Sequence, residues 1–251
     1  MGCRPETAQR VERAAPVSSK ASVSAPIAPG CESAARLAIA CTAATSGILL
    51  ALHFIKPELE PSWRFLSEYA IGQHGWLMQA AFLIWAVSCA ALASALRGEV
   101  RARPGRFGIA TLYIVSYALI AAGLFPQDPV TIQPYEGTTS GRVHAVASMI
   151  GIPGMPLAAM LISSSLWRSN PAWKPYRAVL MTAAHATWIS LVLMIAYLAW
   201  AVPQAGGFNP AVWAGWMNRL VVATYLAWQL VVALHLLERS SAAQMPSGAG
   251  Y

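Results

Sequence analysis

Long uncharged apolar runs alternate with short charged segments along the chain. A helix that crosses a membrane needs roughly 20 mostly apolar residues, because it rises about 1.5 Å per residue through a hydrocarbon core about 30 Å thick. Six stretches meet this requirement: 37–55, 76–96, 107–125, 144–167, 178–202 and about 210–237. The pattern predicts an all-α polytopic membrane protein, a single bundle of six transmembrane helices.

The boundary between the fifth and sixth stretches rests on local signals. Residues 178–218 carry no charge and are too many for one helix. The segment 203–210 (Pro-Gln-Ala-Gly-Gly-Phe-Asn-Pro) interrupts them, with Asn209 as the expected N-cap and Pro210 as the first helical residue. All connections are short, which favours antiparallel neighbours in one membrane domain over residues 33–238. Residues 1–32 are predicted to be a disordered cytoplasmic tail, and residues 239–251 a flexible C-terminal tail.

Composition and charge agree with a membrane protein. The chain is 57% hydrophobic and 11% charged, whereas soluble domains have about 25% charged residues. The net charge of +7 is explained by basic cytoplasmic loops, so membrane lipids are the expected partners and nucleic acid is not. Thirteen of the 17 Lys and Arg residues lie on the side that carries both termini. The positive-inside rule therefore places both termini in the cytoplasm, in the cell's inner or plasma membrane.

Most of the unusual polar residues lie at the other, outer end of the predicted helices. An ionisable group at membrane depth is costly and marks a function or a buried pair. The candidate acid–base or metal-binding residues are Glu68, Asp128, His144 and His53. The candidate ligand-binding residues are Arg219, Asn218, Tyr69, Ser67 and Arg142. No compact metal-binding motif connects them, so cofactor and metal are left open, and structural hydrogen bonding is the alternative role for each.

Arg219 is the clearest case. A helix that starts at Pro210 would place it about 13 Å along the axis. Three interpretations stay open: a structural ion pair with Glu68 or Asp128, a clamp for an anion or a lipid head group, or an Arg that reaches the interface through lipid. In the fourth stretch, Pro153 and Pro156 predict either a simple kink or a break that lines a cavity.

Three motifs carry a resemblance to a known family. They are Ser67-Glu68-Tyr69 before the second stretch, Gly123-Leu-Phe-Pro-Gln-Asp128 after the third, and Gly141-Arg-Val-His144 at the start of the fourth. In order and placement they resemble domain of unknown function 998, a family of bacterial and archaeal six-helix membrane proteins, over residues 35–237. Tyr69-Ala70 stands where the family usually has Leu-Gly. The Frag1/DRAM/Sfk1 membrane proteins are a more distant analogy in helix count and loop motifs.

Three functions remain open. The first is a membrane protein whose outward-facing polar pocket binds a lipid or small amphipathic ligand without turnover. The second is an enzyme that acts on a lipid or isoprenoid through acid–base or metal-assisted chemistry at Glu68, Asp128, His53 and His144. The third is a small-solute transporter, which the lack of a visible repeat disfavours. The oligomeric state is not predicted.

Overall fold

Six long helices make up the computed structural model, which describes residues 29–132 and 136–244. They are α1 (Pro29–Ile55), α2 (Gly75–Leu96), α3 (Arg103–Leu124), α4 (Thr139–Ser169), α5 (Arg177–Gln204) and α6 (Ala214–Gln244). Two short 3₁₀ helices, η1 (Leu66–Ala70) and η3 (Pro171–Tyr176), lie in the connections. All six long helices are long and apolar enough to cross a membrane, which confirms the predicted fold class. Most of the predicted N-terminal tail, and residues 245–251 of the C-terminal tail, lie outside the described residues.

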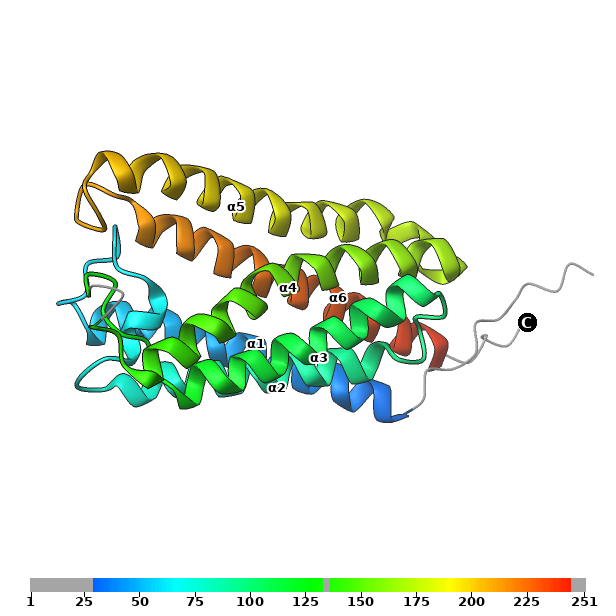
Figure 1. Cartoon of the computed structure of the whole chain (residues 1–251). Coiled ribbons are helices and arrows are strands. Elements are labelled where there is room, and N and C mark those ends of the chain that lie inside the picture. Colours follow the sequence, from blue (N-terminus) through cyan, green and yellow to red (C-terminus); the bar gives the residue numbers. More distant parts are fainter. Residues whose placement is uncertain (1–28, 133–135, 245–251) are drawn as a thin grey trace, which may run out of the picture.

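The helices form a closed ring in chain order. Each helix packs against the next one, and α6 returns to pack against α1. Figure 1 shows α5 on the outside against α6, and α4 crossing obliquely from α3 toward α5. We call the two ends of the bundle the loop end and the terminal end. The loop end holds the connections 56–74, 125–138 and 205–213, and the terminal end holds 97–102, 170–176, the start of α1 and the end of α6.

Buried polar side chains join the helices across the ring. Trp85 on α2 donates to Gln229 on α6 at 2.8 Å, and Trp228 on α6 donates to Ser163 on α4 at 3.0 Å. In lipid the hydrophobic effect does not hold helices together, so such hydrogen bonds and close packing carry the association.

Helix α4 stays continuous through its two prolines, so Pro153 and Pro156 do not break it. Pro156 has no N–H to bond the carbonyl of Ile152, four residues earlier. The hydroxyl of Tyr225 on α6 donates to that carbonyl at 2.7 Å. The interior proline thus creates an acceptor, and a neighbouring helix supplies its donor.

The start of α6 differs from the prediction, which was wrong by one helical turn. The Asn209 side chain accepts from the N–H of Ala211 at 2.9 Å and forms a local turn instead of an N-cap. The N–H of Trp213 then donates to the Tyr197 hydroxyl at 3.0 Å. Helix α6 therefore begins at Ala214, and Arg219 lies about 8 Å into it rather than about 13 Å.

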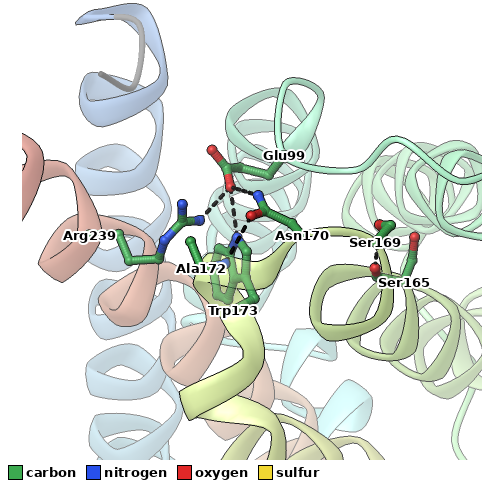
Figure 2. Close-up of polar contacts among 7 residues, drawn as sticks. All are labelled: Glu99, Ser165, Ser169, Asn170, Ala172, Trp173 and Arg239. Carbon is green, nitrogen blue, oxygen red and sulfur yellow. Dashed lines mark hydrogen bonds and ion pairs between the residues drawn. The ribbon is translucent and has the colours of Figure 1, made fainter. Parts of the chain in front are cut away.

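The terminal end is joined by a cluster around Glu99 (Figure 2). One Glu99 carboxylate oxygen accepts from Asn170 at 2.9 Å, from the Trp173 indole at 2.7 Å and from Arg239. The Arg239 guanidinium also lies 4.9 Å from the centre of the Trp173 ring. The cluster connects the α2–α3 loop, η3 and α6. Sequence analysis missed it, although Glu99 is the only acid among the four arginines of that loop.

Gly215 brings the first turn of α6 against the α1–α2 loop. A Cβ atom at this position would lie 2.2 Å from the Pro61 carbonyl oxygen and 2.7 Å from that of Arg64. The next residue, Trp216, donates its N–H to the Ser62 carbonyl at 3.2 Å. The contact is backbone against backbone, so no side-chain movement can relieve an added methyl group.

Gly215→Ala is therefore expected to lower stability, by about 1–3 kcal/mol for an overpacked contact. The matched control is Gly47→Ala in α1, where a Cβ would meet nothing within 4 Å. Thermal unfolding in detergent should show a lower Tm for Gly215→Ala only. Equal Tm values for the two variants would contradict the close contact.

Candidate functional site

Arg219 is the centre of a polar cluster at the loop end. Its Nε donates to His53 Nε2 at 2.8 Å, and its Nη2 donates to the Tyr69 hydroxyl at 3.0 Å. Its Nη1 donates to the backbone carbonyls of Arg64 at 2.8 Å and of Gly215 at 3.1 Å. The cluster thus joins α1, η1 and α6 through one guanidinium group.

The hydrogen bonds of His53 identify its tautomer. Its Nδ1 lies 2.7 Å from the Leu49 carbonyl, which can only accept, so Nδ1 carries the proton. Its Nε2 faces the N–H of Arg219 and must accept. His53 is therefore a neutral imidazole, packed edge-on against the Tyr69 ring with centroids 5.4 Å apart.

All four hydrogen-bond partners of Arg219 are consequently neutral. The ion pairs among the described residues are Arg36–Glu32, Lys56–Glu58, Arg64–Glu68 and Arg239–Glu99. The ion pair of Arg219 with Glu68 or Asp128, one of the three interpretations considered, does not form among these residues. The positive charge of Arg219 is solvated by neutral dipoles, and the buried Glu68 carboxylate acts on it only from beyond ion-pair distance.

Glu68 is fully buried and joins two loops. One carboxylate oxygen accepts from the N–H of Phe65 at 2.8 Å, and the other accepts from the N–H of Val130 at 2.9 Å. The Arg64 guanidinium lies 3.5 Å from the second oxygen. These contacts hold the α1–α2 loop to the α3–α4 loop and favour a structural role for this carboxylate.

Asp128 orders the start of α4. Its two oxygens accept from the N–H and the hydroxyl of Thr138, both at 2.8 Å, and the Thr138 hydroxyl accepts in turn from the N–H of Gly141 at 2.9 Å. A Cβ at Gly141 would lie 2.0 Å from an Asp128 oxygen. Glycine at this position leaves room for the carboxylate, which explains part of the Gly141-Arg-Val-His144 motif.

A second group of candidate residues lines a cavity inside the ring. His144, Asn218 and Ser67 all face this cavity of about 90 Å³, whose other walls are mostly apolar. The Nδ1 of His144 lies 2.9 Å from the Phe125 carbonyl and 3.2 Å from that of Ala122, so it carries the proton. His144 is buried, and its Nε2 has no hydrogen-bond partner among the described residues. The wall of the cavity therefore includes a histidine whose Nε2 is free to accept a hydrogen bond.

Two further polar contacts of this cavity involve η1. Asn218 accepts from the N–H of Leu66 at 3.0 Å, and the Ser67 hydroxyl donates to the Gln127 side chain. Gln127, which sequence analysis did not single out, belongs to the same loop as Asp128. These bonds place η1 over the cavity.

A groove runs along the outside of the ring between α1 and α6. It has a volume of about 490 Å³ and carries His53, Trp216 and Arg219 at its loop end. Below them its walls are mainly apolar, from Leu49 and Leu50 on α1 to Leu226 and Leu230 on α6. Three residues, Leu49, Leu66 and Val222, line both the groove and the inner cavity.

Lys56, another residue that sequence analysis did not single out, binds backbone carbonyls at the end of η1. It is 2% exposed, and its Nζ donates to the carbonyl of Tyr69 at 3.2 Å and to that of Ile71. Burial lowers the pKa of Lys56, and Glu58 opposes this change from 3.9 Å. The Tyr69 residue is thus held at its carbonyl by Lys56 and at its hydroxyl by Arg219.

The candidate residues do not form one site. His53, Tyr69 and Arg219 meet, Ser67, His144 and Asn218 line the cavity, and Glu68 and Asp128 hold loops. Arg142 is exposed and its side chain has no hydrogen-bond or ion-pair partner in the described part of the chain. Across residues 29–132 and 136–244, no three His, Cys, Asp or Glu side chains come together in a group that could hold a metal ion.

The fold defines a multi-pass membrane protein of six helices. The chain belongs to the family described as "Protein of unknown function (DUF998)", whose family model matches residues 38–235. This match extends from α1 to α6 and confirms the resemblance drawn from the three loop motifs. No curated protein and no solved structure matches the chain.

Glu68→Ala tests the structural role of the buried carboxylate. Three donors, the N–H groups of Phe65 and Val130 and the Arg64 guanidinium, would lose their acceptor, at a cost of about 3–5 kcal/mol for a broken buried pair. The control is Glu58→Ala, because Glu58 is exposed and its ion pair with Lys56 is long, at 3.9 Å. We expect a large loss of Tm for Glu68→Ala and almost none for Glu58→Ala. A folded Glu68→Ala variant with wild-type Tm would show that this acid is free for another role.

Proposed function

We propose that this protein binds an anionic amphiphile, such as a phospholipid, in the groove between α1 and α6. The Arg219 guanidinium contacts the anionic head group, and the apolar chain lies along the groove. His53 and Tyr69 orient the guanidinium. By the positive-inside rule the loop end faces outward, so the ligand belongs to the outer leaflet.

The observation that carries this proposal is the charge of Arg219. A guanidinium has five N–H donors, and the neutral partners of Arg219 use four of them. One Nη2 hydrogen remains, at the head of a groove in which Arg219 is a lining residue. A cation that no acid contacts directly is costly at membrane depth, and Glu68 acts on Arg219 only from beyond ion-pair distance. An anionic group in contact with the remaining Nη2 hydrogen would therefore stabilise both partners.

The length of the groove supports a chain-bearing ligand. On α1 its wall extends from His53 to Thr42, which is 11 residues or about 16 Å along the helix. Half of a bilayer's hydrocarbon core is about 15 Å thick. The groove therefore matches the depth of one leaflet, with its cation at the end where a head group lies.

The experiment compares lipid binding by wild-type protein and Arg219→Gln. Delipidated protein in detergent is titrated with phosphatidylglycerol, and bound lipid is counted by native mass spectrometry. Diacylglycerol with the same chains serves as the neutral probe. Loss of a charge-assisted contact should weaken phosphatidylglycerol binding by about ten- to a hundredfold, leave diacylglycerol binding unchanged, and be partly reversed in Arg219→Lys.

The matched control is Arg101→Gln, which removes one exposed positive charge at the terminal end. It should bind phosphatidylglycerol as wild type does. If Arg219→Gln keeps the wild-type unfolding temperature and wild-type phosphatidylglycerol affinity, Arg219 is a structural residue and the proposal is wrong.

A second candidate function is catalysis on such a lipid, and the observation that favours it is the orientation of His144. Its Nδ1–H donates to two carbonyls, its Nε2 has no hydrogen-bond partner among the described residues, and the residue lines the inner cavity. This is the arrangement of a general base. The cavity shares three wall residues with the groove, so a ligand in the groove would lie next to it.

His144→Asn separates the two functions. The Asn amide keeps a donor near the position of Nδ1 and removes the Nε2 acceptor. If the protein is an enzyme, His144→Asn should abolish product formation from a lipid extract in nanodiscs, read by mass spectrometry, while phosphatidylglycerol binding persists. Identical lipid profiles with and without wild-type protein would eliminate this candidate and leave the binding function standing.

A further inference from the structure

The terminal end of the bundle has a second groove, which the proposed function does not use. It lies where α4 ends and α5 begins, and it has a volume of about 600 Å³. Where α4 ends and α5 begins, the groove is lined by Trp167, Arg168, Lys174 and Arg177. From these residues we propose that the groove binds the anionic head group of a phospholipid.

The three cations of this groove have no acid beside them. None of Arg168, Lys174 and Arg177 takes part in an ion pair among the described residues. At the same end of the bundle, Glu99 is already engaged by Arg239, Asn170 and Trp173. Among the described residues, therefore, no carboxylate lies within ion-pair distance of these three cations.

Two of the cations contact the same indole ring, that of Trp167. The guanidinium of Arg177 lies 4.6 Å from the centre of the Trp167 ring, and that of Arg168 lies 5.0 Å from it. Like charges repel, and the attraction of both to one indole offsets that repulsion. An anion that contacts both guanidinium groups would remove the repulsion and gain bidentate hydrogen bonds. The N-terminus of α5, which begins at Arg177 and has no side-chain cap, adds its positive dipole end.

The lower part of the groove fits a lipid chain better than a soluble anion or a peptide. It follows one face of α5 through Ala178, Met181, Thr182 and His185, a spacing that keeps these residues on the same side of the helix. From Ala178 to His185 this face extends about 10 Å into the spanning part of α5. In a membrane, lipid chains cover this face of α5. Basic pockets between helices at the membrane surface bind phospholipid head groups.

The test uses full-length protein in detergent and the double variant Arg168→Gln/Arg177→Gln. Delipidated protein is titrated with cardiolipin or phosphatidylglycerol and, separately, with inorganic phosphate, and bound lipid is counted by native mass spectrometry. Each cation near an anionic lipid contributes about fivefold in affinity. The double variant should therefore bind the lipid that Arg219→Gln still retains about twenty- to thirtyfold less tightly.

Two controls keep the outcomes distinct. Arg101→Gln/Arg106→Gln removes the same two charges from exposed positions of the same end, outside the groove, and should bind as wild type does. Arg219→Gln should leave this second lipid population unchanged, so failure of the proposed function and failure of this inference are separable. Equal losses in the two double variants would mean that only net charge matters, and phosphate binding as tight as lipid binding would mean a site for free anions. Either result would overturn the inference.

Discussion

One guanidinium group at membrane depth constrains the whole loop end of this protein. Arg219 needs acceptors, and the structure supplies them from α1, from η1 and from the α1–α2 loop. To reach it, the loop must lie directly on α6, which the glycine at 215 permits. The η1 turn must then be held from its other sides, by Lys56 at its carbonyls and by Glu68 through the α3–α4 loop. A network of structural bonds thus holds a cation that forms no ion pair among the described residues.

The polar residues of the loop end have different roles, although they lie at similar positions along the helices. Glu68 and Asp128 are acids whose oxygens are occupied by backbone and side-chain donors, whereas Arg219 and His144 each keep an unused hydrogen-bonding atom at a groove or cavity. A residue is a candidate for ligand binding when it has an unused hydrogen-bond donor or acceptor and lines a groove or cavity. Polarity alone is not sufficient. The same criterion identifies the unpaired cations at the start of α5.

The six helices could be predicted because apolar runs bounded by charges have few other solutions in a membrane. The start of α6 could not, since Asn209-Pro210 suits both an N-cap and a turn, and the Asn side chain bonds to the residue two positions on. The ion pair considered for Arg219 does not form among the described residues. The acceptors of Arg219 include backbone carbonyls and a neutral imidazole, and a pattern of charges in the sequence cannot reveal such acceptors. The Glu99 cluster, by contrast, is indicated in the sequence by one acid within a basic loop. The contact of Tyr225 has a weaker sequence signal, because an interior proline implies a free backbone carbonyl that needs a donor.

We propose that Arg219 contacts the anionic head group of a bound lipid. The most direct measurement is the dipolar coupling between ¹⁵N-labelled arginine side chains and lipid ³¹P, by solid-state NMR on protein in phosphatidylglycerol bilayers. We expect a coupled arginine signal that disappears in Arg219→Gln and persists in Arg168→Gln/Arg177→Gln. A spectrum of Arg219→Gln with every ¹⁵N–³¹P coupling of the wild type would contradict it.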